Sequence, residues 1–268
     1  MIATANISLC EKTNHIRLVL LYVGHALVGR EWRGTIINPD VSRLYYIANG
    51  DAVILGKDGS RTALTAGKWV LLPAGFSFDF SCEAQMEHIY CHLKLCDLDG
   101  LDMLASYASP AVFDVPDIDD KFFIDHLQSS DITSGLLVRH KLEEVLLTFL
   151  KEQEIRIEYN QYSPCVVKAI KYIKRHLTAQ LTASEVAEHV FVSNSTLTKR
   201  FKTELSKSVV EYINDTIMFE AGQLLLKTNL SILAVSEKYG FSDQFYFSRR
   251  FKEKFGMSPM KYRQSVVT

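Results

Sequence analysis

The sequence predicts a two-domain α+β protein, and three features of its 268 residues lead to that prediction. Short apolar runs between turn dipeptides fill the first half, a helical stripe follows, and one helical pattern occurs twice in the second half. We therefore expect a β-barrel or jelly roll over residues 1–115 and a helical dimerisation segment and linker over 116–161. An all-α domain with two helix-turn-helix motifs joined by a linker helix is expected over 162–268.

The composition is that of a folded protein from a reducing compartment. Hydrophobic residues make up 47% of the chain and charged residues 23%, which excludes a disordered or collagen-like chain. Residues 1–6 lack the basic start and apolar run of a secretory signal, and the apolar stretch 18–23 is too short to span a membrane. The five cysteines include no C-x-x-C pair, so no disulfide framework or zinc ribbon is expected. These features predict a cytoplasmic protein without a membrane partner.

The net charge of −1 is divided unequally between the two halves. Residues 162–268 carry 16 Lys/Arg and 9 Asp/Glu, a net of +7, whereas residues 1–161 carry 14 and 22, a net of −8. This asymmetry predicts that only the second half meets a polyanion. Neighbouring domains can also differ in charge without functional meaning, so the motifs must decide.

Turn dipeptides divide the first half into short strands. Asn49-Gly50 and Asp58-Gly59 both tolerate the positive φ angles of two-residue hairpin turns. They predict antiparallel hairpins between strands at 44–47, 52–55 and 61–64. Further turns at 66–67 and 73–75, followed by alternating apolar residues at 76–80 and 88–95, continue the meander. Many short strands in this order indicate a small barrel or jelly roll.

Small barrels often enclose one small ligand. Four residues have side chains that stack on or hydrogen-bond to a sugar-like effector, although packing and surface roles are the alternative: Trp32, Arg43, Tyr90 and His92. A metal site is not expected, because four strand residues place the Cα atoms of His88 and His92 about 13 Å apart. Zinc requires both nitrogens within about 2.1 Å of the ion. We expect no cofactor, no metal and no catalytic residue.

The middle segment has the pattern of a helix–helix seam. Four apolar residues follow one another at spacings of four, three and four, and two more widen the stripe: Val138, Leu142, Val145 and Phe149, with Leu146 and Leu150. The spacing predicts a helix that pairs subunits. The alternative is a helix packed on its own barrel. The polar stretch 151–162 then reads as the interdomain linker.

The second half contains an internal repeat at a constant offset of 50 residues. The pattern Phe201-Lys202, Ser208 and Tyr212 recurs as Phe251-Lys252, Ser258 and Tyr262. Each copy reads as two short helices joined by a tight turn, with capping boxes expected at Thr182/Glu185 and Ser208/Glu211 and further caps at Ser193, Ser231 and Ser242.

The apolar residues at intervals of four from Val209 to Leu225 predict a helix between the copies. A helix over 208–226 spans about 28 Å, whereas successive turns of B-DNA lie about 34 Å apart. A stiff connection of this order fits two reading elements on one side of a duplex. A plain scaffold helix would explain the rod but not the repeated elements.

The segment 240–263 contains Gly-Phe-Ser-Asp-Gln at 240–244 and Phe-Gly-Met-Ser-Pro at 255–259. It resembles the signature of the AraC/XylS transcription regulators, and the resemblance extends back to Leu181. The run of turns at 49–75 resembles the cupin-type sensor barrel that precedes such domains in bacterial regulators. Two departures are Ile217, where the family commonly has arginine, and Ser206, where glycine is frequent.

The resemblance implies a sequence-specific DNA-binding regulator and no enzyme activity. An activator is expected, which binds double-stranded promoter DNA as a homodimer, contacts RNA polymerase and responds to a small effector such as a sugar in a cupin-like barrel. Two alternatives stay open: a regulator whose barrel only dimerises, and a metal-dependent cupin enzyme.

Helical spacing and the resemblance assign the same residues to DNA. If Leu197 and Phe201 face the core, the opposite face of their helix is exposed, and the second copy follows the same rule. The candidates are Asn194, Ser195, Thr198, Lys199, Lys202, Gln244, Phe245, Ser248, Arg249, Arg250 and Lys252. Arg249 suits guanine, Gln244 adenine and Phe245 a thymine methyl group. Lys202, Arg250 and Lys252 suit phosphates, and Lys199 suits either guanine or phosphate.

Overall fold

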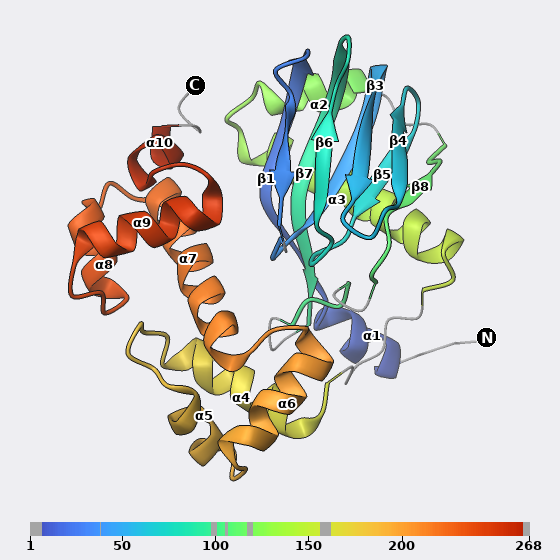
Figure 1. Cartoon of the computed structure of the whole chain (residues 1–268). Coiled ribbons are helices and arrows are strands. Elements are labelled where there is room, and N and C mark those ends of the chain that lie inside the picture. Colours follow the sequence, from blue (N-terminus) through green and yellow to red (C-terminus); the bar gives the residue numbers. More distant parts are fainter. Residues whose placement is uncertain are drawn as a thin grey trace. The chain divides into compact units, whose positions relative to one another are not determined.

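The computed structural model describes residues 7–37, 39–97, 101–104, 107–116, 120–155 and 162–264 (Figure 1). The expectations for residues 1–6 and for most of the linker, 156–161, lie outside the described residues. The chain divides into two compact units, Met1–Gln161 (unit 1) and Tyr162–Thr268 (unit 2). Within the described parts of the chain, no helix combines the length and apolar character needed to cross a membrane.

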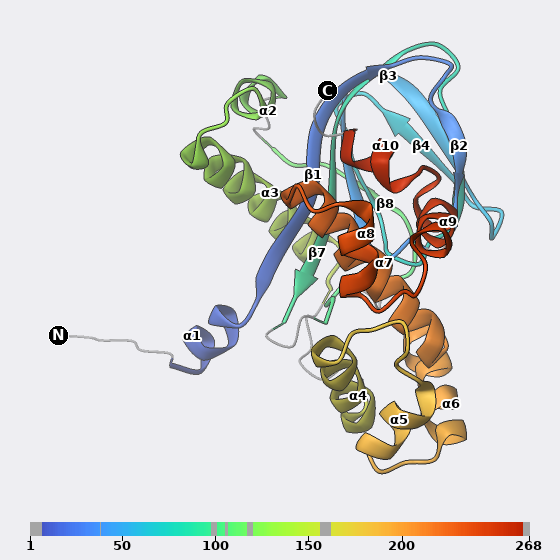
Figure 2. The same ribbon diagram turned by 90° about the vertical axis from the view of Figure 1, so that its left-hand side faces the viewer.

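Unit 1 is an antiparallel β structure with a helical layer (Figure 2). Its elements are α1 (Ile7–Asn14), β1 (Arg17–Val28), β2 (Arg33–Ile36), β3 (Ser42–Gly56), β4 (Arg61–Thr65), β5 (Trp69–Leu72), β6 (Phe78–Ser81), β7 (Met86–Cys96), β8 (Ala111–Phe113), α2 (Asp120–Leu127) and α3 (Ile132–Glu152). One path of strands runs β1-β7-β3-β5-β8, while β4 and β6 pair with β3 and β2 pairs with β6. With a helical unit 2, this confirms the two-domain α+β class and the antiparallel sheet.

The hairpin expected at Asn49-Gly50 is wrong, because β3 runs through it without a break. The first half of β3 pairs with β5, its second half pairs with β4 and β6, and β7 runs beside the first half and the bend. The register with β7 shifts between Ile47 and Asn49, and Gly50 has a φ of +77°. The positive φ therefore serves a bulge that passes the strand between partners. The hairpin at Asp58-Gly59 is confirmed, since β3 and β4 pair across it.

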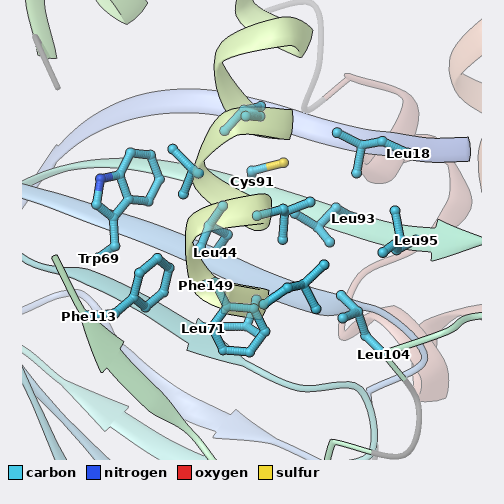
Figure 3. Close-up of a cluster of buried hydrophobic side chains, with 14 of the residues drawn as sticks. Leu18, Leu44, Trp69, Leu71, Cys91, Leu93, Leu95, Leu104, Phe113 and Phe149 are labelled. Carbon is cyan, nitrogen blue, oxygen red and sulfur yellow. The ribbon is translucent and has the colours of Figure 1, made fainter. Parts of the chain in front are cut away.

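The helix α3 packs on the sheet of its own unit, so the predicted subunit seam is wrong. All four seam residues are buried in one cluster with β-strand side chains: Val138, Leu142, Val145 and Phe149, together with Leu146 and Leu150. Figure 3 shows Phe149 among Leu44, Leu71 and Phe113, and the Phe113 and Phe149 ring centroids lie 5.3 Å apart. The a/d spacing was therefore that of a helix covering a sheet, the alternative that the sequence left open.

Unit 2 is helical throughout its described residues. Its helices are α4 (Pro164–Arg175), α5 (Ala183–His189), α6 (Asn194–Leu205), α7 (Val209–Lys227), α8 (Ile232–Lys238), α9 (Gln244–Phe255) and α10 (Pro259–Gln264). We call α5 and α6 the first helix pair and α8 and α9 the second helix pair. The rod α7 lies between them in the chain and contacts both.

The predicted helix starts are confirmed with one exception. Thr182/Glu185 and Ser208/Glu211 form complete capping boxes, and the Ser193 and Ser231 side chains accept hydrogen bonds from the first turns of α6 and α8. The cap expected from Ser242 is wrong. Asp243 takes this position, and its carboxylate accepts the backbone N–H groups of Phe245 and Tyr246. The two carboxylate oxygens each accept one of these N–H groups, and the negative charge favours the helix N-terminus.

The 50-residue repeat in the sequence is a repeat of packing. Phe201 and Phe251 are both fully buried, and each meets a tyrosine of the following helix edge-on. The ring centroids lie 5.8 Å apart for Phe201–Tyr212 and 5.2 Å apart for Phe251–Tyr262, at interplanar angles of 83° and 77°. Edge-to-face pairs are a favoured aromatic geometry. Each helix pair therefore docks through the same contact.

The second helix of each pair, α6 or α9, is followed by a residue in the left-handed conformation. Ser206 has a φ of 56° and Gly256 a φ of 72°. Glycine adopts this conformation without strain, whereas a side chain makes it unfavourable. The first copy therefore carries a strain that the second copy avoids.

We expect Ser206→Gly to stabilise unit 2 by about 0.5–1 kcal/mol, because it relieves this strain. Gly256→Ala should destabilise it by a similar amount, since nothing lies within 4 Å of the added Cβ and only the backbone is affected. Urea unfolding followed by the helical circular-dichroism signal measures both. A lower midpoint for Ser206→Gly would contradict the left-handed C-cap.

Candidate nucleic-acid interface

The second helix pair presents a mixed polar and aromatic face on α9. Phe247 and Phe251 are fully buried beneath it. The expected DNA contacts lie on the opposite side of the helix, where Phe245, Arg249 and Lys252 are exposed and Gln244, Ser248 and Arg250 are half-buried. Phe245, Ser248, Arg249 and Lys252 are three, four or seven residues apart and share one stripe of the helix, whereas Gln244 and Arg250 lie on its two flanks. The structure thus brings these six candidates together on a single element.

The first helix pair presents the corresponding stripe on α6. Leu197 and Phe201 are buried. The expected contacts lie at the positions 50 residues before those of α9: Asn194, Ser195, Lys199 and Lys202 are exposed, and Thr198 is half-buried. The stripe of α6 is therefore polar and basic, whereas that of α9 adds an exposed aromatic ring.

Sequence reasoning missed Tyr246 as part of this face. This residue is 46% exposed, next to Phe245 at 75%. The Arg249 guanidinium lies over the Tyr246 ring, 5.4 Å from its centroid. A cation over an aromatic face is held in place by the ring quadrupole. The spacing of three residues on a helix was the signal that could have paired Tyr246 with Arg249.

Two of the basic side chains at the interface are held by carboxylates. Lys202 Nζ lies 3.2 Å from Glu211 Oε2, and Arg250 Nη1 lies 3.1 Å from Glu253 Oε2. Hydrogen bonds from the Ser208 backbone and side chain, with the added effect of Lys202, lower the pKa of Glu211 to about 2. Glu211 therefore stays ionised, and it orients Lys202 while it caps α7.

In unit 1, the four candidate effector residues lie on the inner face of the sheet, opposite α3. A chain of ring contacts joins Trp32 to Tyr90 through His88, with centroids 5.8 and 5.5 Å apart. Tyr90 continues to His92 at 6.3 Å. Arg43 is the register partner of His92 on the neighbouring strand. All four candidates are half-buried rather than enclosed.

Burial keeps the two histidines of this face neutral. It lowers the pKa of His88 to about 4 and, together with the charge of Arg43, that of His92 to about 3. Arg43 Nη1 and His88 Nδ1 are buried without a hydrogen-bond partner among the described residues. Across all the residues that the structure describes, no three His, Cys, Asp or Glu side chains are grouped so that they could hold a metal ion. The face offers ring surfaces and unpaired polar atoms, which suit an organic ligand.

Comparison with known proteins matches residues 186–265 to a helix-turn-helix domain family. The arabinose operon regulatory protein of Escherichia coli is 35% identical over 134 residues, which are 48% of this chain and 44% of that protein. The xylose operon regulatory protein of Haemophilus influenzae is 32% identical over 100 residues, 37% of this chain and 26% of that protein. The chain thus spans less than half the length of these relatives.

The fold is similar to that of a solved structure over nearly the whole chain. The apo structure of a ToxT variant from Vibrio cholerae matches with a TM-score of 0.62 at 14% identity and covers 92% of this chain and 96% of that one. At this identity the likeness concerns the fold. The matched proteins named as operon regulators are not enzymes, as the sequence led us to expect. These matches support the resemblance of unit 2 to the AraC/XylS transcription regulators, which its repeated motif indicated.

Proposed function

We propose that this protein is a sequence-specific DNA-binding regulator that reads promoter DNA with α6 and α9. The main support is a pair of aromatic contacts 50 residues apart, Phe201–Tyr212 and Phe251–Tyr262. Because these contacts fix the inward sides of α6 and α9, the matching polar stripes of the two helices face solvent. Unit 2 also holds a net charge of +7 within a chain whose total is −1. A positive surface with exposed Arg and Lys side chains on one helix face is the usual footprint of a duplex reader.

Base reading falls to α9 in particular. Arg249 would donate both guanidinium N–H groups to guanine O6 and N7, and Gln244 would pair with adenine N6 and N7. The exposed Phe245 ring would contact a thymine methyl group. Lys202, Arg250 and Lys252 would exchange carboxylate or water for phosphate, and this contact fixes position rather than sequence. On α6, Asn194, Ser195 and Thr198 supply shorter polar groups and Lys199 a cation.

The rod α7 supports simultaneous binding by both helix pairs. Its 19 residues give a length of about 28 Å at 1.5 Å per residue. Reading elements on one side of B-DNA must be about 34 Å apart. The widths of the two helix pairs add to the length of α7, so the distance between the recognition helices can exceed that of the rod alone. We therefore treat α5–α6 and α8–α9 as two helix-turn-helix motifs in successive major grooves.

For unit 1 we propose a cupin-like barrel that binds a small effector on its inner face. Trp32 and Tyr90 would stack on the ligand, while Arg43 and His92 would bond to its polar groups. Support comes from the half-buried rings and the unpaired Arg43 Nη1. It also comes from relatives: one is an arabinose operon regulator, and a ToxT structure holds an unsaturated fatty acid. If the barrel instead only dimerises, no small molecule should bind to it.

We further propose an activator that works as a homodimer and contacts RNA polymerase. The buried seam residues cannot pair subunits, but the other side of α3 exposes apolar side chains at Ile132, Leu136 and Leu147. Their helical spacing forms a stripe that a second copy would cover. A metal-dependent cupin enzyme is the less supported reading, since the relatives are regulators.

The test of this function is the Arg249→Ala variant on specific and random DNA. We expect a loss of about 1–3 kcal/mol on a selected specific site, because a bidentate guanine contact disappears. Binding to random duplex should change much less. Lys151→Ala, an exposed charge of unit 1, is the matched control. Equal losses on both DNAs in fluorescence-anisotropy titrations would contradict base reading by Arg249.

Affinity for DNA should fall steeply with salt, since bound cations release counterions from phosphates. Three to four phosphate contacts give a slope of about −3 to −4 for log K against log salt concentration. Lys202→Ala should reduce the slope by about 1, whereas Lys151→Ala should not alter it. A flat salt response of the full chain would refute the proposed use of the basic residues of unit 2.

Effector binding can be read from the two tryptophans of the chain. A bound metabolite should quench Trp32 on the inner face but not Trp69, which is buried against α3. Trp32→Phe should therefore abolish the signal, and Trp69→Phe should retain it. At 100 times its Kd, the ligand should also stabilise unit 1 by about 2.7 kcal/mol. A panel of sugars and carboxylic acids without any thermal shift would favour an effector-free barrel.

A further inference from the structure

The second helix pair contacts the loop that precedes the first helix pair, in addition to α7. The loop between α4 and α5 reaches the turn of the second helix pair, where the Ala179 backbone N–H donates to the Tyr239 carbonyl over 2.8 Å. The Gln180 side-chain amide donates to the Gly240 carbonyl. A Cβ on Gly240 would collide with Gln180 and Thr178, and its φ of +76° also favours glycine. We call this contact the loop brace.

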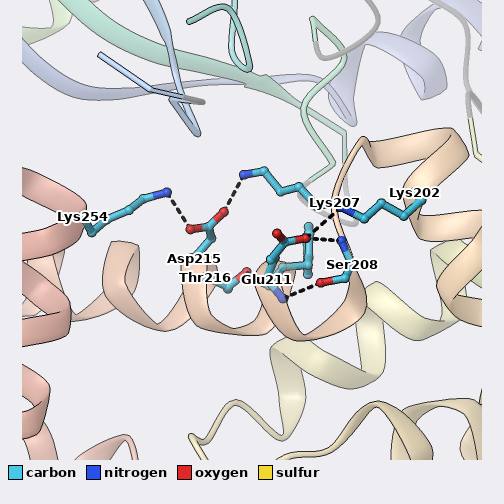
Figure 4. A network of polar contacts seen from close by, with 8 residues as sticks. Lys202, Lys207, Ser208, Glu211, Asp215, Thr216 and Lys254 are labelled. Atoms are coloured by element: carbon cyan, nitrogen blue, oxygen red, sulfur yellow. Dashed lines mark hydrogen bonds and ion pairs between the residues drawn. The ribbon is translucent and has the colours of Figure 1, made fainter. Parts of the chain in front are cut away.

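A second contact joins the pairs through one carboxylate of the rod. Asp215 of α7 binds Lys207 and Lys254 with its two oxygens, each over 2.6 Å (Figure 4). Lys207 follows the end of α6, and Lys254 lies in the last turn of α9. The side chains of Asp215, Lys207 and Lys254 are only 23%, 14% and 22% exposed. We call this contact the carboxylate brace.

The carboxylate brace is stronger than an ordinary surface ion pair for two reasons. Low exposure reduces screening by water and salt, so the attraction between the charges is larger than at the surface. The single carboxylate also binds both lysines, so its loss removes two ion pairs at once. It therefore ties the end of α6 to the end of α9 across the rod.

We propose that the two braces fix the orientation of α9 relative to α6 and thereby set the spacing between the two DNA half-sites that this protein accepts. Asp215 and Gln180 are positioning residues, since they act through the recognition helices. The inference rests on the function proposed above. One added base pair turns and shifts a half-site by about 36° and 3.4 Å. A rod alone tolerates part of this change by twisting, whereas braced helix pairs do not.

The experiment compares Asp215→Asn with Glu220→Gln in the full chain. Both variants remove one negative charge from α7, but Glu220 is exposed and is not part of either brace. A tandem site is first selected from random duplex DNA with the unaltered protein. Affinities are then measured for this site and for versions with one or two base pairs inserted or deleted between the half-sites.

We expect the unaltered protein and Glu220→Gln to show the same sharp preference for one spacing. In Asp215→Asn the preference should fall about three- to tenfold, the range expected when partly buried ion pairs are lost. Gln180→Ala should lower it in the same direction. A variant that binds every spacing more weakly by one common factor, or keeps the full preference, would overturn the inference.

A second measurement needs no DNA. Spin labels at Thr203→Cys on α6 and Glu237→Cys on α8 report the distance between the pairs, in a background where the exposed Cys10 and half-buried Cys165 are replaced by serine. The distance distribution should broaden in Asp215→Asn but not in Glu220→Gln. Equal widths would contradict the braces. A selection that enriches no DNA sequence would contradict the proposed function instead. The widths of the spin-label distance distributions would still test the two braces.

Discussion

The edge-on contact between a buried phenylalanine and the next helix is the interaction on which unit 2 depends. It occurs twice, as Phe201 with Tyr212 and as Phe251 with Tyr262. The buried pairs Leu197/Phe201 and Phe247/Phe251, four residues apart, fix the inward side of each helix. Residues about half a turn away, such as Lys199 and Arg249, therefore face solvent. The recognition stripes of α6 and α9 are thus a consequence of core packing, and their chemistry can vary without altering the fold.

Local signals in the sequence were sufficient for most of unit 2. Serine and threonine followed three residues later by glutamate led correctly to the caps of α5 and α7, because a capping box involves only neighbouring atoms. The exposed stripes followed from helical spacing and the repeat. The cap of α9 was misplaced by one residue, since Ser242 and Asp243 both qualify and only the geometry of the turn selects between them.

Unit 1 was harder because its decisive contacts join residues far apart in the sequence. Asn49-Gly50 has the composition of a hairpin turn, but β7 runs alongside the whole segment and stabilises a bulge instead. The stripe of α3 fits a partner helix and a sheet equally well, and the strands that cover it all end well before α3 begins. The braces at Asp215 and Gln180 also escaped, since single polar residues give no periodic signal.

Unit 1 and unit 2 use polar groups in different ways. On the inner face of unit 1, burial holds His88 and His92 neutral and leaves Arg43 Nη1 without a hydrogen-bond partner among the described residues. In unit 2, polar groups are paired at the braces and caps but exposed on the stripes. Unpaired groups are costly unless a ligand satisfies them, so the two kinds of surface suit a small molecule and a solvated polyanion, respectively.

We expect α6 and α9 to enter one side of a duplex together. Hydroxyl-radical footprinting of the full chain on a selected site measures this directly, because the radical reports each protected sugar along both strands. Two reading helices on one side of the duplex should protect two windows on the same face, centred about 10–10.5 base pairs apart. A single window, or two windows on opposite faces of the duplex, would contradict it.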